Sequence, residues 1–315
     1  MKFFFTALFI LTLFANYPIY GKILPENELS QSNRLIKSYE LSSINILSLN
    51  TWGLPINMPN SNNKERYQKI ITNINSCEFE IICLQETFNK VMRQEIYDYI
   101  HPSYFRQKKW LENRNILGAI QMDTQGGLLT ISKFPTIEEE FISFVSRNKN
   151  LIEDVGKKGF LLTYLDIYTD TVLVINTHLH ADKNSTASSI RLEQLKEINS
   201  YIIKHKLNEK YPIYLAGDLN IHSSEYLHYC EDRHLYEYLK NEMKLIDPME
   251  NICEDFFTYG TSINKYSDKN SKNYKLDYIL YSQSKITKPL INNDVIFKNE
   301  EALSDHCGIR CQIKK

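Results

Sequence analysis

Short apolar runs alternate along the chain with longer segments of helical periodicity. Runs typical of buried strands occupy residues 44–49, 79–84, 127–132, 160–167, 171–177, 213–216, 276–281, 295–298 and 306–313. Apolar residues at helical spacing predict helices over residues 65–77, 89–101 and 188–204, and helical segments within 223–245. The order mixes strand–helix–strand crossovers with antiparallel hairpins. It therefore predicts an α/β fold, a four-layer sandwich of two mixed β-sheets flanked by helices.

The composition fits one domain of this kind. The chain has 315 residues, of which 43% are hydrophobic, and this is enough apolar material for a sizeable core. No internal repeat, low-complexity tract or proline-rich linker divides the chain, so we expect a single folded domain over residues 44–315. The formal net charge of -1 gives the molecule no field that attracts polyanions, which disfavours tight non-specific binding of nucleic acid.

The amino terminus has the pattern of an export signal. Lys2 precedes the apolar stretch 3–15, which has the length of a secretory signal core and falls short of the ~20 residues that a membrane-spanning helix requires. Residues 1–21 are therefore expected to be a signal peptide, with Gly21 as one candidate for the cleavage position, followed by an N-terminal extension over residues 22–43. The predicted location is secreted, and an uncleaved membrane anchor is the alternative.

Six cysteines would meet oxidising conditions after export. Cys307 and Cys311 would lie ~13 Å apart on an extended strand, which is too far for a disulfide between them. Cys83 falls inside an apolar run and is expected to be a buried thiol. We suggest one bridge, between Cys230 and Cys253.

Polar residues stand where the predicted strands end or begin. In the segment 217–220 an aspartate and an asparagine are two residues apart, so they point to the same face if the backbone stays extended. Taken singly, such residues have structural explanations, including a turn, a solvated strand terminus, an edge histidine or a capping carboxylate. Strand ends at one rim of a sandwich can converge, however. The pattern predicts one cleft lined by Asn50, Glu86, His178, Asp218, Asn220, Asp277 and His306.

Six separated motifs resemble the endonuclease/exonuclease/phosphatase superfamily, in the correct order, and the resemblance extends over residues 44–313. The motifs are Leu49-Asn50-Thr51-Trp52-Gly53, Leu84-Gln85-Glu86-Thr87, Asn176-Thr177-His178-Leu179-His180-Ala181, Gly217-Asp218-Leu219-Asn220, Leu276-Asp277-Tyr278-Ile279 and Ser304-Asp305-His306-Cys307.

Within this superfamily, three segments look most like the neutral, magnesium-dependent sphingomyelinases. They are residues 50–55, 156–160 and 177–181. Residues 84–87 and 304–307 resemble apurinic endonucleases at least as well. This departure keeps a nuclease open as an alternative.

The resemblance implies a Mg²⁺ site. Glu86 would be the main ligand, helped by Asn50 and by Asp305, either directly or through water. Magnesium prefers oxygen ligands and retains waters, so a carboxylate and an amide oxygen are a plausible contribution from the protein. The ion would polarise the phosphoryl group and offset charge on the leaving oxygen.

The resemblance also implies roles for the other strand-end residues. His306 would be the general base, and Asp277 would orient its ring and stabilise the imidazolium. Asp218 would help to align the attacking water. Asn220 would donate a hydrogen bond to a phosphoryl oxygen, and His178 would bind a phosphate oxygen.

The function that the resemblance implies is a secreted, magnesium-dependent phosphodiesterase that hydrolyses sphingomyelin to ceramide and phosphocholine by in-line attack of water. Its partner would be sphingomyelin or a related choline phospholipid at a membrane surface, and the protein is expected to act as a monomer. Two alternatives stay open. One is a secreted metal-dependent nuclease on the same scaffold; the other is a catalytically silent binding module, disfavoured because every expected polar position is filled.

Three further segments bear on the substrate. Residues 104–110 combine aromatic and basic side chains, which suits a zwitterionic lipid surface or a nucleic-acid backbone, but equally a basic surface edge with half-buried rings. Lys157 and Lys158, next to Gly159, can approach a phosphate or form a solvated turn. Residues 184–186 fit a glycosylation sequon.

Overall fold

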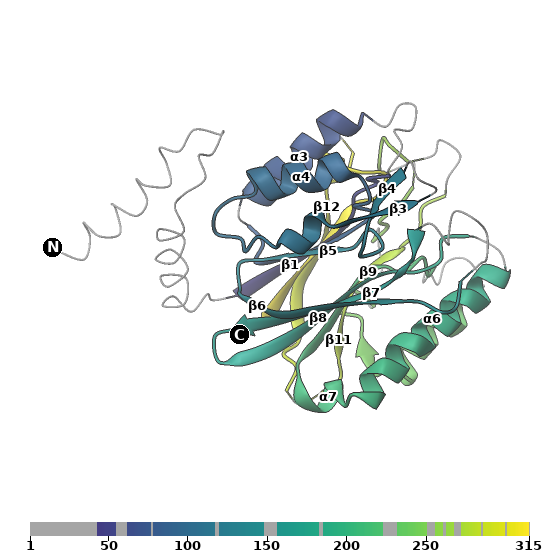
Figure 1. Ribbon diagram of the computed structural model, residues 1–315. Coiled ribbons are helices and arrows are strands. Elements are labelled where there is room, and N and C mark those ends of the chain that lie inside the picture. The colour runs from purple at the N-terminus through teal and green to yellow at the C-terminus, as the bar shows by residue number, and fades with distance from the viewer. Residues whose placement is uncertain are drawn as a thin grey trace, which may run out of the picture.

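The computed structural model describes residues 43–54, 62–76, 78–116, 120–147, 156–182, 185–222, 232–250, 256–260, 263–267, 272–284, 286–299 and 301–314. In Figure 1 these residues form two β-sheets that stack face to face, with helices on both outer sides. None of the helices in these ranges is long and apolar enough to cross a membrane. The signal peptide at 1–21, the extension up to residue 42 and the sequon residue Asn184 lie outside the described residues, so these interpretations stay predictions.

The first sheet has five strands in the order β12-β13-β1-β2-β5. They are β1 (Ser43–Asn50), β2 (Ile81–Gln85), β5 (Leu129–Ser132), β12 (Leu290–Ile296) and β13 (Gly308–Lys314). β1 and β2 run parallel and are joined through helix α3 (Asn63–Asn75), whereas β13 and β5 pair antiparallel with them. The parallel pair brings the carboxyl ends of β1 and β2 to the same edge of the sheet.

The second sheet has six strands in the order β10-β11-β9-β8-β7-β6. They are β6 (Thr136–Ser143), β7 (Gly159–Ile167), β8 (Asp170–His178), β9 (Ile213–Asp218), β10 (Leu245–Ile246) and β11 (Asp277–Ser282). β8 and β9 are parallel and connect through helices α6 (Ser185–Lys204) and α7 (Leu207–Lys210), whereas the other pairs are antiparallel. The amino end of β11 therefore lies beside the carboxyl end of β9.

Smaller elements complete the described fold. They are helix α4 (Lys90–Tyr99), the 3₁₀ helix η1 (Lys108–Leu111), the hairpin of β3 (Asn113–Ile116) and β4 (Ile120–Asp123), and helix α8 (Arg233–Asn241). α4 begins after Asn89 because the side chain of that residue accepts hydrogen bonds from the backbone N–H groups of Val91 and Met92. Helix α4 therefore begins only a few residues after Glu86.

Apolar side chains pack in three layers because successive residues of a strand point to opposite faces of a sheet. In β1, Ile44 and Ile46 pack between the two sheets, whereas Leu47 and Leu49 pack against α3 and α4. The outer face of the six-stranded sheet is covered by α6 and α8, through residues such as Leu195. The predicted architecture of two mixed sheets flanked by helices is confirmed.

The apolar pattern did not predict β6, β3, β4, β10 or the first half of β12. β6 is an edge strand that carries three glutamates in succession, residues 138–140, and its register shifts between Thr136 and Glu138. An edge strand is partly solvated, so it lacks the apolar alternation that marks a buried strand. β12 has a similar register shift between Ile291 and Asp294, where its residues are polar.

The described cysteines agree with the expectations. Cys83, Cys307 and Cys311 are buried free thiols, so Cys307 and Cys311 are not paired with each other. Burial raises the pKa of Cys83 to about 12, which keeps this thiol unreactive. Cys230 and Cys253 lie outside the described residues, and the bridge between them stays a prediction.

The aromatic and basic stretch 104–110 is built into the fold. Tyr104 and Trp110 are each only 1% exposed. Arg106 donates hydrogen bonds to two backbone carbonyl oxygens near the end of α4. This arrangement favours the structural interpretation of the stretch over a contact with lipid or nucleic acid.

Candidate active site

The polar residues at the strand ends emerge from the space between the two sheets. In β1, Ile46 faces that space, and Asn50 follows it in the same phase at the end of the strand. In β9, Ala216 faces the same space, and Asp218 ends the strand two residues later. The alternation that builds the core therefore also aims these polar side chains at one edge of the sandwich.

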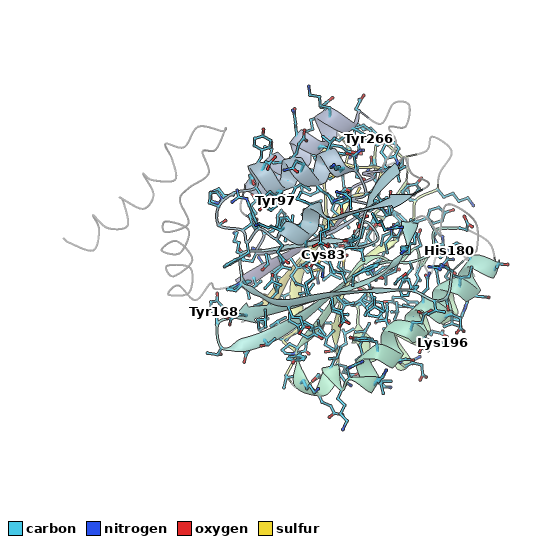
Figure 2. The ribbon with its side chains drawn as sticks, viewed as in Figure 1. Cys83, Tyr97, Tyr168, His180, Lys196 and Tyr266 are labelled. Atoms are coloured by element: carbon cyan, nitrogen blue, oxygen red, sulfur yellow. The ribbon has the colours of Figure 1, made fainter. Side chains whose placement is uncertain are left out.

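Hydrogen bonds of the buried amide side chains of Gln85 and Asn176 connect the two sheets, between the apolar core and this edge. The side-chain nitrogen of Gln85, at the end of β2, donates to Oδ1 of Asn176 in β8 at 2.8 Å. Nδ2 of Asn176 in turn donates to the carbonyl oxygens of Leu84 and Leu129, at 3.0 and 3.1 Å. Figure 2 shows Cys83, two residues before Gln85, in the middle of the molecule. Because buried amides need their partners, this link fixes how the two sheets sit against each other.

β9 and β11 bring two carboxylates directly opposite each other. Asp218 and Asp277 are paired in register and are 1% and 0% exposed. Like charges in such a pair repel each other. His306 lies between them, with Nδ1 at 2.8 Å from Oδ2 of Asp277 and Nε2 at 3.8 Å from Oδ2 of Asp218. A protonated imidazole in this position offsets the repulsion.

Asn50 connects the acid after β2 to the acid at the end of β9. Its Nδ2 donates to Oε1 of Glu86 at 3.1 Å and to Oδ2 of Asp218 at 3.0 Å. Its Oδ1 accepts from the backbone N–H of Trp52 at 3.0 Å. The amide nitrogen of Asn50, and not its oxygen, therefore faces the carboxylate of Glu86.

His178, at the end of β8, lies beside the same acids. Its Nε2 is 3.5 Å from Oδ2 of Asp218 and 4.0 Å from Oε1 of Glu86. Nζ of Lys158 is 3.0 Å from Nε2 of His178 and donates to the carbonyl oxygen of Leu179 at 2.6 Å. Of the two lysines that the sequence singled out, Lys158 is thus a buried member of the site, and the one before it is exposed.

Asn220 and Asp305 complete the set. The backbone does not stay extended after β9, because Asn220 has a left-handed φ of 51°. The condition for Asp218 and Asn220 to share one face, an extended backbone, is thus not met, and the turn that the sequence also allowed is present: Asn220 N–H donates to Oδ1 of Asp218 at 3.0 Å, and its Nδ2 donates to the carbonyl oxygen of Leu179 at 3.3 Å. Asp305 accepts a hydrogen bond from Oγ of Ser304 at 3.0 Å.

Three acids of this site, Glu86, Asp218 and Asp305, have pKa values above those of free carboxyls. Burial, followed by the charge of Asp305, raises the pKa of Glu86 to about 7, although the hydrogen bond from Asn50 acts in the opposite direction. Burial and the charge of Asp277 also raise the pKa of Asp218. Burial raises the pKa of Asp305 as well. A cation bound among these carboxylates would favour their ionised forms.

The two histidines shift in opposite directions. Burial by itself would lower the pKa of His306, but the charges of Asp277 and Asp218 raise it well above 6.5. Burial and the positive charge of Lys158 lower the pKa of His178 well below 6.5. At neutral pH the metal-free site therefore combines one protonated and one neutral imidazole.

The carboxylates of this site fit a divalent cation. Ligand atoms of Asp218, Asp277 and His306 all lie within 4.8 Å of one another. Oδ1 of Asp277 is buried, with no hydrogen-bond partner among the described residues. Carboxylate oxygens are ligands that hard cations prefer, and a bound cation would return Glu86 to its ionised form.

A buried arginine holds the loop that follows Asn50. Arg66, in α3, is 0% exposed. Its guanidinium donates to the carbonyl oxygens of residues 51–52 at 2.8 and 2.9 Å and to that of Leu303 at 3.1 Å. Arg66 therefore ties the loop after β1 to the segment that leads to His306.

A second buried arginine holds the loop that follows Glu86. Arg93, in α4, is 2% exposed and donates to the carbonyl oxygens of residues 87–88 at 3.0 and 2.7 Å. Its Nε donates to the carbonyl oxygen of Trp110 at 2.9 Å. Nothing in the charge pattern of the sequence distinguishes these two arginines from solvated helix residues, and they were not predicted.

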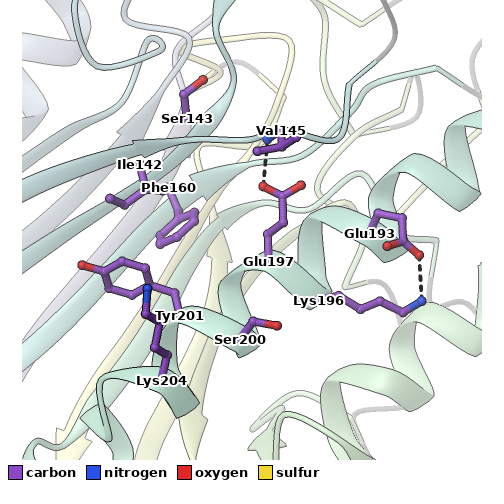
Figure 3. A pocket seen from close by; sticks show the side chains of 10 residues that line it. All are labelled: Ile142, Ser143, Val145, Phe160, Glu193, Lys196, Glu197, Ser200, Tyr201 and Lys204. Carbon is purple, nitrogen blue, oxygen red and sulfur yellow. Dashed lines mark hydrogen bonds and ion pairs between the residues drawn. The ribbon is translucent and has the colours of Figure 1, made fainter.

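A groove of about 530 Å³ lies between β6 and α6 (Figure 3). Phe160 and Tyr201 contribute aromatic rings 5.6 Å apart. The carboxylate of Glu197 accepts the N–H groups of Val145 and Ser146, each at 2.8 Å, which closes one end. No predicted site residue is among those that line the groove.

The shifted pKa values predict how the stability of the metal-free protein depends on pH. The folded pKa of His306 lies well above its unfolded value of 6.5, so folding binds a proton above that pH. The stabilisation is fully present below 6.5 and is lost as pH rises through the folded pKa. The shift of Glu86 from 4.5 to about 7 acts in the same direction.

We therefore expect the free energy of unfolding, measured with urea in EDTA, to fall as pH rises above about 6.5. Asp277→Asn should flatten this dependence, because it removes the first of the two charges that raise the pKa of His306. A metal-free protein whose stability rises over this range contradicts the prediction.

The amino-acid sequence of the chain is similar to those of a protein family and of several characterised enzymes. Residues 47–306 match the model of the Endonuclease/Exonuclease/phosphatase family. Sphingomyelinase C of Leptospira interrogans is 28% identical over 272 residues, which are 81% of this chain and 47% of that protein. Sphingomyelinase C of Bacillus cereus is 25% identical over 233 residues, which are 69% of this chain and 68% of that protein. The chain thus spans about half the length of the Leptospira relative.

Solved structures share the fold. SmcL superposes with a TM-score of 0.68 at 20% identity, covering 86% of this chain and 99% of that one. A variant of beta toxin from Staphylococcus aureus with bound magnesium ions gives 0.62 at 21% identity, covering 85% and 99%. D. rerio TDP2 complexed with a single strand DNA product gives 0.61 at 18% identity, covering 86% and 98%. Because one of these proteins holds DNA, the fold by itself does not select the substrate.

Proposed function

Because the chain belongs to the endonuclease/exonuclease/phosphatase family, we propose that it is a secreted, magnesium-dependent phosphodiesterase that hydrolyses sphingomyelin to ceramide and phosphocholine. The observation that carries the proposal is the cluster at one edge of the sandwich, in which Asn50 links the partly exposed Glu86 to the buried Asp218, and His306 lies between Asp218 and Asp277. Relatives named sphingomyelinase C and phospholipase C support the same class of enzyme, a phosphoric diester hydrolase.

The proposed reaction exchanges one phosphorus–oxygen bond for another. The oxygen of a water molecule attacks phosphorus in line with the ceramide oxygen. The bond to that oxygen breaks, ceramide leaves and takes up a proton, and phosphocholine keeps the oxygen of the water.

His306 is the proposed general base of this reaction. Its Nε2 takes the proton of the attacking water, while Nδ1 donates to Oδ2 of Asp277 at 2.8 Å and so fixes the ring. Asp218, whose Oδ2 is 3.8 Å from Nε2, is placed to accept a hydrogen bond from the same water. The base and the water-aligning carboxylate thus act on one side of the phosphoryl group.

Glu86 is the proposed main ligand of Mg²⁺, with Asn50 and Asp305 beside it. For Asn50 to serve as a ligand its amide must turn, since its nitrogen faces Glu86. When bound, the ion supplies a Lewis acid that polarises the phosphoryl group and offsets charge on the leaving oxygen. The raised pKa of Glu86 and the bound magnesium of the beta toxin variant support this assignment.

Three further side chains are proposed to bind phosphoryl oxygens. Asn220 would donate through Nδ2, which lies at the carbonyl oxygen of Leu179. His178 would donate as a neutral imidazole, since its pKa is lowered by burial and by Lys158. Lys158 adds a positive charge 3.0 Å from that ring. Donors aimed at a phosphate gain strength as charge develops in the transition state.

The proposed substrate is sphingomyelin or a related choline phospholipid in a membrane surface, reached by a secreted monomer. The alternative is a secreted metal-dependent nuclease. A nuclease holds several phosphates and is expected to carry a basic track, whereas this chain has a formal net charge of -1. A silent binding module is disfavoured, because the predicted polar positions that converge are all of catalytic type.

The substrate is tested by two assays run in parallel. Purified protein with Mg²⁺ should release phosphocholine from sphingomyelin vesicles much faster than it nicks plasmid or abasic duplex DNA. His306→Ala is assayed alongside, so that activity from a contaminating enzyme is recognised. Cleavage of DNA that depends on His306, together with intact sphingomyelin, would show that the protein is a nuclease.

A further inference from the structure

Two tyrosines lie in a row with His306, the proposed general base. Tyr259 forms an antiparallel bridge with His306 on one side and with Tyr274 on the other. The bridge between the tyrosines is closed by hydrogen bonds in both directions, at 3.0 and 2.7 Å. Side chains of directly paired residues lie on the same face of a sheet. Tyr274, Tyr259 and His306 therefore stand side by side.

Ring contacts are present at both ends of this row. The ring centroids of Tyr259 and His306 are 5.0 Å apart. On the far side, the ring of His222 lies 4.3 Å from that of Tyr274, at an angle of 58°. His306 is buried, whereas Tyr259, Tyr274 and His222 are each partly exposed. The row thus leads from the proposed base towards the surface of the protein.

We propose that the tyrosine row, Tyr259 and Tyr274 with His222 at its end, binds the quaternary ammonium group of a choline headgroup. This inference rests on the proposed function and names the part of the substrate that it selects. A quaternary ammonium has no N–H to donate, so it forms no N–H hydrogen bond to a carboxylate or carbonyl oxygen. Oxygen ligands therefore do not select it over a cation that carries N–H groups. Aromatic faces attract it through their negative quadrupole and present apolar surface to its methyl groups.

The position of the row matches the chemistry of the headgroup. In a choline phosphodiester only an ethylene bridge separates the ammonium group from an ester oxygen on phosphorus. A site that selects it must therefore lie directly beside the groups that act on phosphorus. Tyr259 touches the ring of His306, and Tyr274 lies one bridge further out. A stacked nucleobase is the other ligand that such rings accept, and it is an outcome of the test below.

Tyr274 is the residue to vary, because it belongs to the row without touching His306 in the described contacts. Tyr274→Leu keeps apolar bulk and removes the ring, whereas Tyr274→Phe keeps the ring. Each protein is assayed on vesicles that contain either sphingomyelin or ceramide phosphoethanolamine. The two lipids share the ceramide and the phosphodiester and differ only in the methyl groups on nitrogen.

We expect wild type to prefer sphingomyelin. Tyr274→Leu should lower kcat/KM on sphingomyelin by about tenfold and change the rate on the ethanolamine lipid much less. Tyr274→Phe should retain the preference. In a second measurement without turnover, titration of free phosphocholine followed by tyrosine fluorescence should show weaker binding to Tyr274→Leu and little change for phosphoethanolamine.

Other results overturn the inference in distinguishable ways. An equal loss of Tyr274→Leu on both lipids shows that the ring is structural. If wild type cleaves both lipids equally, and Tyr274→Leu leaves the ratio of the two kcat/KM values unchanged, the row is not a headgroup site. The proposed function is then unaffected. A wild type that cleaves neither lipid, and cuts DNA in a way that depends on His306 and Tyr274, overturns both and makes the row a base-stacking surface.

Discussion

Replacing Glu86 with Gln is expected to lower magnesium-dependent hydrolysis by about 10²-fold or more and to weaken Mg²⁺ binding in parallel. The new side chain can still accept the hydrogen bond from Asn50, but it brings no negative charge to a cation. The same change should stabilise the metal-free protein above pH 7. Burial and Asp305 raise the pKa of Glu86 from 4.5 to about 7, so folding opposes its ionisation and the amide avoids that cost.

Both effects are measured on one set of samples, by calorimetric titration of Mg²⁺ and by thermal unfolding in EDTA at about pH 8. Glu80→Gln is the matched control. Glu80 is a buried glutamate just before β2 that pairs with Lys133 at 3.0 Å. Its replacement should lower stability and leave Mg²⁺ affinity unchanged. Full activity of Glu86→Gln after exhaustive chelation contradicts the metal role.

Replacing His306 with Ala is expected to lower kcat by ~10²- to 10⁴-fold and to remove the rise of the rate with pH. In wild type that rise should lie above 6.5, because Asp277 and Asp218 raise the pKa of His306 against the effect of burial. Asp277→Asn should move the rise to lower pH and also lower the maximum rate, since the ring loses the partner that orients it.

The measurement is the pH profile of kcat/KM for the three proteins. A magnesium ion nearby adds positive charge and lowers the pKa of the histidine, so that pKa is read separately by NMR on the metal-free protein. His101→Ala is the control, because His101 is half-buried and bonded to Ser103 outside the site. A His306→Ala protein with the wild-type rate and profile would assign the base elsewhere.

The convergence of the site residues could be predicted because it follows from two simple regularities. Parallel strands such as β1 and β2 end at the same edge, and the alternation of side chains is visible in the apolar residues. Asn50 and Asp218 continue the inward phase of Ile46 and Ala216, so the core pattern carries information about the polar residues that follow it.

Other parts of the site leave no such signal. The sequence left an extended backbone and a turn both open at Asn220, and the chain turns there with a left-handed φ of 51°. Lys158 looked like one of two equivalent lysines, and only the packing of the sheets shows which of them is buried beside His178. Turn geometry and burial depend on neighbours distant in sequence, which local patterns do not contain.

The tyrosine row was invisible for a related reason. Tyr259 pairs with Tyr274 and His306 through single bridges outside any strand. Residues around a single bridge do not alternate between apolar and polar, so the sequence pattern does not predict the bridge. The edge strand β6 was missed because its three successive glutamates interrupt the apolar alternation of a buried strand.

The two buried arginines have a consequence for which substitutions the protein can accumulate. Arg66 and Arg93 hold residues 51–52 and 87–88 by backbone carbonyl oxygens, which every amino acid possesses. With respect to these contacts, the side chains of both loops are free to drift in related sequences or in laboratory evolution. The arginines are not, because a lysine ammonium cannot span the separate oxygens that a planar guanidinium reaches. Selection for a new substrate can therefore replace side chains at residues 51–52 and 87–88 while Arg66 in α3 and Arg93 in α4 are retained.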